Sequence, residues 1–405
     1  MTKVALLHYS APPIVGGVES VLGRHARLMA GAGHRVTIVA GRGEQTNPHI
    51  PFVQVPRADS RHRDVLAIKT ELDAGRVPAE FYDLVDSLTA DLSGILDGAE
   101  ILFAHNVCSL NKNLALTAAV RNLAGRNSLQ IVLWHHDLAW TTPRYRAELH
   151  DGYPWDLLRQ AWPGVKQVTI SEMRQRELAE LFQMDQEAIE VIPNGVDIAD
   201  FHKLEKQTRE QVKQLDILHA SPLLLLPVRI TPRKNIELAL RVCAKLTGSF
   251  PELRLVITGP LGPHNPANVT YFEKLVGLRK ELGLDRVVRF LAELTSEYIP
   301  DEVISDWYHL ADALFMPSYE EGFGIPILEA GLANLPVFCS DIPPLKNLGG
   351  SYATYFSPDD DPETIANTIA NQLSANSVFQ SRTNVRRHYD WEGVYRRSIA
   401  PLLIG

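Results

Sequence analysis

Cysteine is scarce in this chain of 405 residues, which contains only Cys108, Cys243 and Cys339. An odd number of widely spaced cysteines predicts neither a disulfide framework nor a pair of cysteine metal ligands. Because disulfides accumulate in oxidising compartments, we expect a protein of the reducing cytoplasm.

Long apolar runs are also missing. The most apolar stretch, residues 223–228, is far shorter than the ~18 residues that a membrane-spanning helix needs. The N-terminal sequence MTKVALLHYS has too short an apolar run for a signal peptide. We therefore expect neither a membrane span nor a secretory leader.

Positive charge is not in excess either. The chain has 40 Lys and Arg against 48 Asp and Glu, which gives a formal net charge of −8. Dedicated nucleic-acid binders usually have a basic excess, and an acidic chain is repelled by an anionic membrane surface. We expect no nucleic-acid partner and little association with membranes.

The composition is that of a globular protein, with 45% hydrophobic and 22% charged residues. Short apolar runs alternate with amphipathic stretches in the first half of the chain. The runs predict strands at 3–8, 35–40, 100–104, 130–134 and 166–170, and the first amphipathic stretch predicts a helix at 17–32. Strands that are apolar throughout are typical of a parallel sheet with both faces buried.

The same pattern restarts after the turn signal Pro193–Asn194–Gly195. Strands are predicted at 223–228, 254–258, 287–290, 313–316 and 337–340, and helices at 236–248, 269–282, 327–333 and 362–372. We therefore predict an α/β protein of two facing Rossmann-like, doubly wound domains, 1–195 and 196–380, with a cleft between them. Ligands of such sheets bind beyond the carboxyl ends of the strands, so functional residues should follow strands directly.

A glycine turn framed by carboxylates follows the predicted strand at 313–316. Glu321 and Glu329 are separated by seven residues, and Pro326 stands where a helix should begin. Amides of Phe323, Gly324 and Ile325 at this helix start are suited to a phosphate, and the carboxylates to sugar hydroxyls. The alternative is an ordinary glycine turn with solvated glutamates.

Cations and glycines follow two other predicted strands. Arg229 and Lys234 come after the strand at 223–228 and suit a diphosphate, whereas Arg233 is the candidate for a solvated charge. Gly16 and Gly17 stand where the first helix should begin, another place at which an anion can approach. Many turns between a strand and a helix need glycine without binding anything.

Six segments, in order along the chain, resemble family 4 of the retaining glycosyltransferases, which have the GT-B fold. The segments are GGVES at 16–20, SEMRQRELAE and IPNGVDIADF within 171–201, RITPRKN at 229–235, ITGP at 257–260, and ADALFMPSYEEGFGIPILEAG at 311–331. The last contains a Glu-x7-Glu motif and is the most specific. The resemblance implies that helices in 381–405 pack back on the N-terminal domain.

The resemblance also implies site residues. Arg229 and Lys234 match the cations that hold the donor diphosphate, Glu321 the carboxylate beside the donor sugar, and Glu329 the one that binds the ribose. The amides of Phe323, Gly324 and Ile325, and those of Gly16 and Gly17, match the loops over sugar and phosphates.

A histidine of the family lies close to the transferred sugar. In the segment IVLWHHDLAW that residue is His136, paired with Asp137, and His135 is the alternative. The segment 261–272 bears on recognition of the donor base and gives no prediction of which base binds.

The resemblance implies retention of anomeric configuration, and the cations supply the charge that other transferases take from a metal. We expect neither a metal ion nor another cofactor besides the nucleotide-sugar co-substrate. The only Asp-x-Asp string, Asp359–Asp361, precedes a predicted helix, and we interpret it as a turn with a helix N-cap.

The acceptor is expected on the N-terminal domain, where residues 134–162 combine four Trp, two Tyr, three His and three Arg. Aromatic rings stack on sugars and arginines bind anionic groups, so we predict a small anionic acceptor held by members of one set. That set is His135, Trp140, Arg144, Tyr145 and Arg146, with Arg159 as a further cation. The alternative is a folded insertion whose aromatics form core and whose arginines pair with Glu148, Asp151 and Asp156.

The resemblance implies a hexosyltransferase that uses a nucleotide sugar of the UDP-glucose or GDP-mannose type. A lipid- or polysaccharide-directed transferase, a sugar-nucleotide epimerase of the same fold and a non-catalytic sugar-nucleotide-binding module remain alternatives. A NAD-dependent oxidoreductase is disfavoured, because no Gly-x-Gly-x-x-Gly follows the first strand.

Overall fold

The computed structural model describes residues 1–125, 129–261 and 266–404, and these form two compact units. The first unit comprises Met1–Gly195 and Trp391–Gly405, and the second comprises Val196–Asp390. The chain therefore leaves the first unit at residue 195 and returns to it at residue 391, so that residues 381–390 belong to the second unit.

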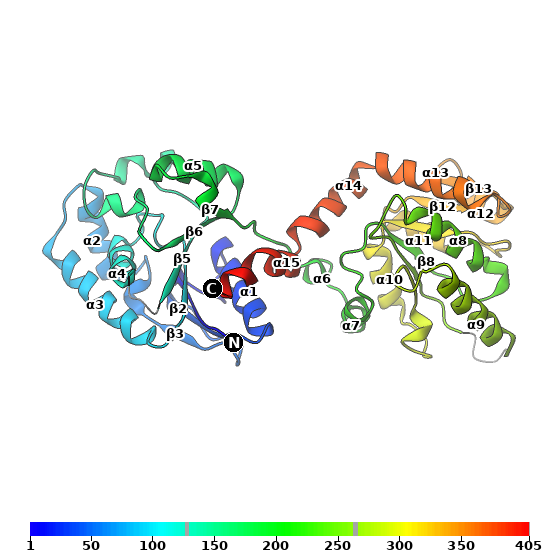
Figure 1. The fold of residues 1–405 in the computed structure, drawn as a ribbon, viewed down its shortest axis with the longest axis horizontal. Coiled ribbons are helices and arrows are strands. Elements are labelled where there is room, and N and C mark those ends of the chain that lie inside the picture. Colours follow the sequence, from blue (N-terminus) through cyan, green and yellow to red (C-terminus); the bar gives the residue numbers. More distant parts are fainter. Residues whose placement is uncertain (126–128, 262–265, 405) are drawn as a thin grey trace. The chain divides into compact units, whose positions relative to one another are not determined.

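The first unit contains a sheet of seven parallel strands in the order β3-β2-β1-β4-β5-β6-β7 (Figure 1). Its strands are β1 (Lys3–Ser10), β2 (Arg35–Arg42), β3 (Phe52–Gln54), β4 (Ile101–His105), β5 (Gln130–His135), β6 (Lys166–Thr169) and β7 (Ile189–Val191). The strand order reverses direction between β1 and β4, so the loops after these two strands diverge at one edge of the sheet.

Helices cover both faces of this sheet. They are α1 (Gly17–Gly31), α2 (Arg63–Asp73), α3 (Ala79–Ile95), α4 (Leu114–Leu123), α5 (Glu172–Phe182) and α15 (Trp391–Val394). One face packs its alternate residues, such as Leu7 and Leu102, against α2, α3 and α4. The other face packs Leu6 and Phe103 against α1 and the returning segment 391–403, and Figure 1 shows α15 beside α1.

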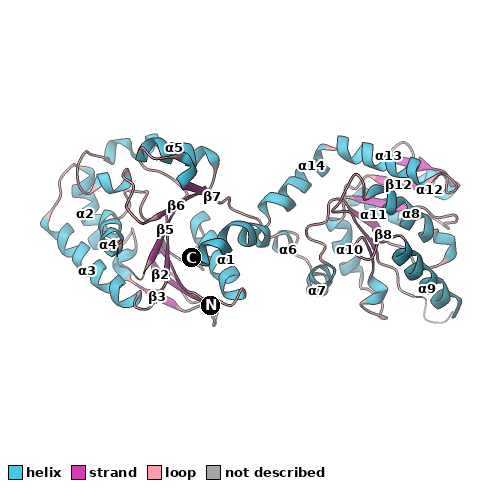
Figure 2. Ribbon diagram, in the orientation of Figure 1, coloured by secondary structure: helices cyan, strands magenta, loops and turns pink. Residues whose placement is uncertain are grey.

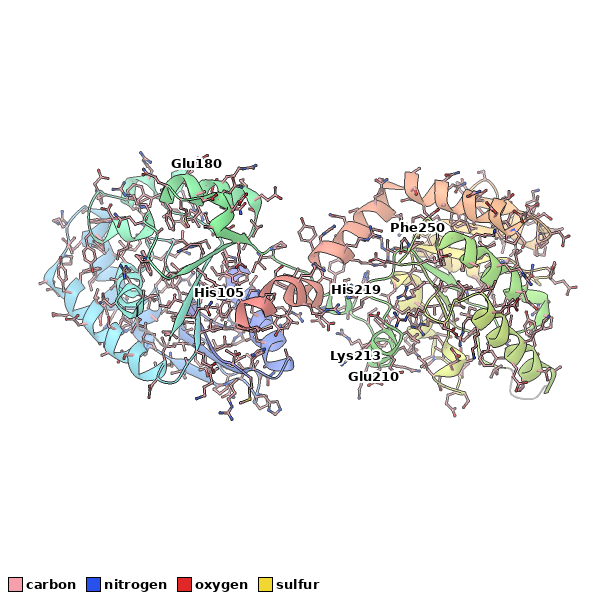
Figure 3. All side chains as sticks on the ribbon, in the orientation of Figure 1. His105, Glu180, Glu210, Lys213, His219 and Phe250 are labelled. Atoms are coloured by element: carbon pink, nitrogen blue, oxygen red, sulfur yellow. The ribbon has the colours of Figure 1, made fainter. Side chains whose placement is uncertain are left out.

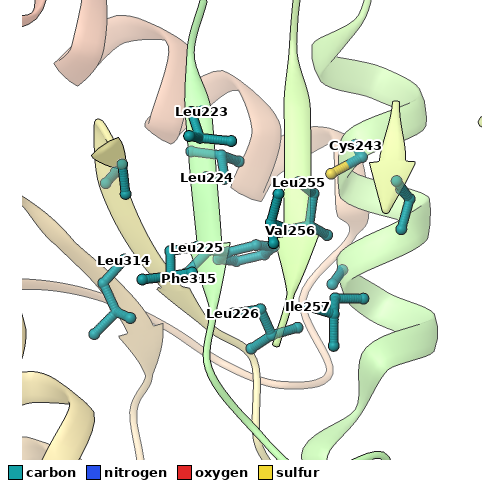
Figure 4. Packing of buried hydrophobic residues seen from close by; sticks show 14 of the residues in the cluster. Leu223, Leu224, Leu225, Leu226, Cys243, Leu255, Val256, Ile257, Leu314 and Phe315 are labelled. Carbon is teal, nitrogen blue, oxygen red and sulfur yellow. The ribbon is translucent and has the colours of Figure 1, made fainter. Parts of the chain in front are cut away.

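The second unit repeats this plan with six parallel strands in the order β10-β9-β8-β11-β12-β13. They are β8 (Leu223–Leu226), β9 (Arg254–Ile257), β10 (Val288–Phe290), β11 (Ala313–Met316), β12 (Val337–Ser340) and β13 (Ala353–Phe356). Every residue of β8, β11 and β12 is buried. Figure 4 shows Leu225 and Leu226 of β8 packed beside β9 and β11, with Cys243 of a neighbouring helix.

Helices also flank this sheet, as the alternation of cyan and magenta in Figure 2 shows. They are α6 (Ile198–Phe201), α7 (Lys206–Leu215), α8 (Ile236–Leu246), α9 (Pro266–Glu281), α10 (Asp301–Leu310), α11 (Ile325–Leu332), α12 (Pro343–Gly349), α13 (Pro362–Ala375) and α14 (Ser377–Asn384). None of the helices in the described ranges is long and apolar enough to cross a bilayer. The strand order reverses between β8 and β11.

The predicted α/β class of two Rossmann-like, doubly wound units is confirmed. All ten predicted strands are present, to within a few residues at their ends, whereas β3, β7 and β13 were not predicted. These three are edge strands, and most of their residues are only partly buried or exposed, so they lack the continuous apolar run that revealed the others.

One local prediction is confirmed. The carboxylate of Asp361 accepts hydrogen bonds from the amides of Glu363 and Thr364 (3.1 and 3.3 Å), so the Asp359–Asp361 string ends in a helix N-cap. In the turn after α11, Asn334 has a φ of +56°, which asparagine adopts more readily than most residues.

A buried ion pair holds the last helical turn of the second unit to its sheet. Arg386 lies in the π-helical turn Val385–Tyr389, and its Nη1 is 2.6 Å from Oδ2 of Asp312 at the start of β11. The two side chains are 7% and 1% exposed, and the same carboxylate oxygen accepts from the amide of Leu223 at 2.8 Å. Removal of Asp312 would leave the buried charge of Arg386 unpaired, whereas Asp312 has a second partner in Arg382, whose Nε is 3.6 Å from Oδ1.

We therefore expect Asp312→Ala to lower the free energy of unfolding by about 3–5 kcal/mol, because it leaves the buried charge of Arg386 unpaired. Urea unfolding followed by circular dichroism measures the change. The matched control is Glu363→Ala, which breaks the exposed Lys245–Glu363 pair (3.1 Å) and should cost less than about 1 kcal/mol. Equal losses in the two variants would contradict the role of the buried pair.

Candidate functional site

The loops at the reversal point of the second sheet are joined by a buried ion pair. Lys234 ends the short helical turn Pro232–Lys234 after β8, and Glu321 lies in the loop after β11. Nζ of Lys234 donates to both carboxylate oxygens of Glu321, at 2.6 and 2.7 Å, and each side chain is 8% exposed. The structure thus brings two predicted donor residues into direct contact.

Several further contacts fix this pair. The hydroxyl of Ser318 donates to Oε1 of Glu321 at 2.8 Å, and the amide of Tyr319 donates to the carbonyl of Arg233 at 2.9 Å. Asn235, with a φ of +51°, ends the helical turn and begins α8. The two loops are therefore joined by both side-chain and backbone bonds.

The helix that follows Glu321 begins as predicted. Gly324 is its N-cap with a φ of +102°, a backbone conformation that favours glycine, and Pro326 occupies the first turn. A Cβ on Gly324 would lie 2.7 Å from Cδ2 of Leu345. Phe323 and Ile325 are each 57% exposed, so these side chains do not shield the first turn of α11.

Glu329 lies on the next turn of α11 and is held from a neighbouring helix. Its carboxylate accepts a short hydrogen bond from the hydroxyl of Tyr308 in α10. Burial and this carboxylate raise the pKa of Tyr308 far above its ordinary value, so the phenol stays a donor. Both residues line a pocket of about 370 Å³ between α10 and α11.

Arg229 differs from Lys234 in its environment. Its side chain is exposed, as is that of Arg233. The loop after β9 passes close to Val228, and position 259 in it has room only for glycine. A Cβ there would lie 1.8 Å from the carbonyl oxygen of Val228. The segment 261–272, on which base recognition was placed, lies partly outside the described residues, at 262–265.

In the first sheet, histidines lie at the corresponding place, the carboxyl ends of the central strands. His8 is near the end of β1, His105 ends β4 (labelled in Figure 3), and His136 follows β5. A ring nitrogen of His8 bonds the carbonyl of His105 at 2.7 Å, and the rings of His105 and His136 are joined at 3.5 Å between Nδ1 and Nε2. His25 of α1 also packs against His105, with ring centroids 5.2 Å apart.

Burial keeps these imidazoles neutral. It lowers the pKa of His25 and of His136 to about 3 and that of His8 to about 4, and it lowers that of His105 well below the ordinary 6.5. His136 therefore enters any reaction as a neutral group that donates or accepts a hydrogen bond.

Gly16 and Gly17 lie at the predicted place, the start of α1. The carboxylate of Glu19 folds over Gly16, where a Cβ would lie 2.0 Å from it, and Oε1 accepts from the hydroxyl of Ser10 at 2.6 Å. Glu19 is thus an acid in the first turn of a helix, the position that the helix dipole favours.

His135 and Trp140 occupy positions that do not support the predicted acceptor role. His135 is 1% exposed, and its Nε2 bonds Oε1 of Gln167 in β6 at 2.8 Å. Trp140 packs under the guanidinium of Arg159 at 4.2 Å, and its indole donates to the carbonyl of Trp155. Strand alternation explains the first case, since His135 points to the sheet face opposite that of Trp134.

Arg159 itself pairs with Asp151 and Asp156 (2.7 and 2.6 Å), as the alternative interpretation of this segment predicted. Glu148 pairs instead with Lys69 at 2.8 Å. Three Trp rings of the segment are buried in the core: Trp134, Trp155 and Trp162. Much of this aromatic segment is therefore structural.

Arg144, Tyr145 and Arg146 remain as candidates for the acceptor. They lie in the 3-10 helix Pro143–Glu148, where both arginines are exposed. The guanidinium of Arg144 packs on the ring of Tyr145 at 4.7 Å. No carboxylate among the described residues forms an ion pair with either arginine.

Sequence reasoning missed the residues that hold the candidates in place: Ser318 for Glu321, Tyr308 for Glu329, Gln167 for His135 and Asn106 for His136. Tyr308 lies 21 residues from Glu329, and Asn106 lies 30 residues from His136, each in a different element from its partner. No local sequence pattern therefore predicts these contacts. Ser318 is the exception, because it lies two residues after β11 and inside the Glu-x7-Glu segment at 311–331.

Two family models match the chain. Residues 15–200 match the model described as Glycosyltransferase Family 4, and residues 207–388 match that of Glycosyl transferases group 1. Between them the two models cover every strand of both sheets except β1 (Lys3–Ser10).

Curated relatives agree with this match. A D-inositol 3-phosphate glycosyltransferase of Nocardioides sp. is 25% identical over 244 residues, which are 57% of this chain and 52% of that enzyme. A mannosylglucosylglycerate synthase of Thermotoga maritima is 27% identical over 373 residues, 84% of this chain and 83% of that enzyme. The match thus spans about half the length of the first relative.

Solved structures give weaker similarity. Sucrose-phosphate synthase from Thermosynechococcus elongatus is 18% identical with a TM-score of 0.37, and the match covers 99% of this chain and 100% of that one. Anabaena Alr3699/HepE in complex with UDP and glucose is 17% identical with a TM-score of 0.38, and 99% of both chains is covered.

The buried histidines predict a pH-dependent stability. Their folded pKa values lie below the unfolded value of 6.5, so the unfolded chain binds more protons once the pH falls below about 6.5, and stability falls with it. For His25, whose ring nitrogens have no described partner, the loss between pH 7 and pH 5 should be about 2 kcal/mol.

His25→Phe keeps an aromatic ring against Trp134 and Trp391 and removes the titration. We expect it to reduce the difference between urea unfolding free energies at pH 7 and pH 5 by this amount. His49→Gln, at an exposed histidine, should leave the difference unchanged. An unaltered pH dependence in His25→Phe would show that His25 has the same pKa in the folded and unfolded protein, which would contradict the effect of burial.

Proposed function

Because the chain belongs to glycosyltransferase family 4, we propose that it transfers a hexose from a nucleotide sugar to a hydroxyl group of a small anionic sugar or sugar acid. The proposed donor is of the UDP-glucose or GDP-mannose type. The observation that supports this most is the Lys234–Glu321 pair at the reversal point of the second sheet, beside the start of α11. The names of two relatives contain an inositol phosphate and a glycerate, both small and anionic.

On this proposal the donor binds along the loops after β8 and β11. Lys234 and Arg229 bind the diphosphate, together with the amides of Phe323, Gly324 and Ile325. Glu321, held by Lys234 and Ser318, accepts hydrogen bonds from the sugar, and Glu329, held by Tyr308, accepts them from the ribose. We also propose that the amides of Gly16 and Gly17, at the start of α1, bind a phosphate.

The chemical step is a substitution at the anomeric carbon. The bond from this carbon to the phosphate oxygen breaks, the bond to the acceptor oxygen forms on the same face, and the departing phosphate oxygen takes the acceptor proton. Configuration is retained and no dedicated base is required. Fixed positive groups stabilise the leaving diphosphate, so the scheme needs no metal ion.

His136 is preferred over His135 as the histidine beside the sugar. His136 follows the end of β5, where ligands of such sheets bind, whereas the ring of His135 bonds Gln167 on a sheet face. As a neutral imidazole, His136 positions a sugar hydroxyl and bears no charge that would oppose the developing cation of the sugar.

For the acceptor we propose Arg144, Tyr145 and Arg146 as the binding group. Their exposure leaves both guanidinium groups available for a phosphate or carboxylate. A lipid acceptor is less favoured, because arginines of the basic segment 382–397 bind protein atoms: Arg386 binds Asp312, Arg387 binds Glu252, and Arg382 binds carbonyls at 309–311.

Replacement of the central pair tests the donor site. Lys234→Ala and Glu321→Ala should each lower kcat/KM by about 10²–10³, because each removes a preorganised group that acts on the donor. Transfer from UDP-glucose and GDP-mannose is measured in excess EDTA, in which the wild-type rate should persist if no metal takes part. Lys245→Ala, at the exposed Lys245–Glu363 pair, is the matched control.

Near-normal turnover in both site variants would contradict the assignment. A thermal-shift panel with the same two nucleotide sugars identifies the donor, since a ligand of the folded state raises the unfolding midpoint. Product analysis without acceptor separates transfer from epimerisation, which consumes the donor alone.

Arg144→Ala and Arg146→Ala test the acceptor site. We expect at least one of them to raise the acceptor KM by about tenfold or more, with donor KM unchanged, because a charge-assisted hydrogen bond contributes about 1.5–3 kcal/mol. Arg63→Ala, at an arginine whose side chain is 91% exposed, is the control. Unchanged acceptor KM in both variants would leave the segment with a structural role only.

A further inference from the structure

Asn106 lies where three strands of the first sheet end. It follows β4 directly, and its amide donates to the carbonyl of Trp134 in β5 at 2.8 Å. Its own carbonyl accepts from the hydroxyl of Tyr9 in β1 at 3.4 Å. The residue is 3% exposed and has a φ of +58°, which asparagine and aspartate tolerate better than other non-glycine residues.

The side-chain oxygen of Asn106 accepts three hydrogen bonds. Two come from consecutive backbone amides, those of His136 and Asp137, each at 3.0 Å. The third comes from the hydroxyl of Ser109 at 3.1 Å, which holds the side-chain amide from the other side. A carbonyl oxygen buried among three donors has its acceptor capacity fully used.

These bonds fix the turn from which the His136 ring projects. An oxygen that binds two consecutive amides fixes both the position and the orientation of the peptide between them. Arg174 contacts the Asp137 carboxylate on the far side of the turn, but at 3.5 Å, a longer separation than either amide bond. The backbone of the turn thus depends on Asn106 more directly than on this ion pair.

We propose that Asn106 is a positioning residue for His136, acting through the backbone of the His136–Asp137 turn. Asn106 does not itself touch the substrate. The catalytic consequence rests on the proposed function, whereas the structural consequence does not. The left-handed backbone of Asn106 accompanies these side-chain bonds to the turn after β5.

Two substitutions separate the oxygen from the backbone conformation. Asn106→Gly keeps the positive φ and removes the oxygen, whereas Asn106→Asp tolerates the same φ and keeps an acceptor oxygen. Asn334→Gly, at an exposed left-handed asparagine of the second unit, controls for loss of such a residue alone. Each variant is checked for folding by its thermal midpoint.

With the full chain and the donor that the thermal-shift panel selects, we expect Asn106→Gly to lower kcat about a hundredfold, because small misplacements of positioned groups cost this much. Donor KM should change far less, Asn106→Asp should recover most of kcat, and Asn334→Gly should match wild type. Wild-type kcat in Asn106→Gly, or equal loss in the glycine and aspartate variants, would overturn the proposal.

The second readout does not need activity. In protein labelled with ¹⁵N-histidine, the ring resonances of His136, assigned by their loss in His136→Gln, should shift or broaden in Asn106→Gly and stay near their wild-type positions in Asn106→Asp. Unchanged resonances in the glycine variant would overturn the proposal. If the wild-type chain transfers no sugar, the proposed function fails and this spectrum still decides the role of Asn106.

Should Asn106→Gly not fold, Asn106→Ser takes its place. The shorter hydroxyl cannot reach both amides, so the same shift of the His136 resonances and a reduced kcat are expected. Wild-type values for both would overturn the proposal.

Discussion

Helices cover both faces of each sheet, and this constraint determines where polar and charged residues can lie in the molecule. A parallel strand covered by helices on each side has no place for a charged group along most of its length. In β8, β11 and β12 every residue is buried, and four consecutive leucines form β8. Polar chemistry is therefore confined to the ends of strands. There, loops that diverge at the reversal of strand order leave backbone amides and side chains accessible.

The two sheets bury polar groups in different ways at the points where their strand order reverses. In the second unit, Lys234 and Glu321 from separate loops form an ion pair, so that neither of these nearly buried charges is left unpaired. In the first unit, uncharged imidazoles and the amide of Asn106 fill the equivalent place, and burial lowers the pKa values of those histidines. One sheet thus carries a paired lysine and carboxylate at its reversal point, and the other carries neutral hydrogen-bonding groups.

The sequence predicted much of the fold, because continuous apolar runs and turn residues are local signals. It also predicted Gly324 and Pro326 at the start of α11 and Asp361 as an N-cap, all set by neighbouring residues. Edge strands such as β3 were not predicted, because partial exposure interrupts the continuous apolar run that marks a buried strand. The roles of Tyr308 and Asn106 were not predicted because their contacts depend on how distant elements pack. Trp140 looked like a ligand-binding aromatic until its contact with Arg159 was visible.

The return of the chain at Trp391 has a consequence for synthesis on the ribosome. The core between α1 and the first sheet includes Trp391, Val394, Tyr395 and Ile399, which emerge from the ribosome after the whole second unit. The second unit is one continuous segment and has all its core residues by position 390. The unit made first is therefore the last to complete its core, and until then the apolar surface of α1 and β1 that this segment covers stays open to chaperones.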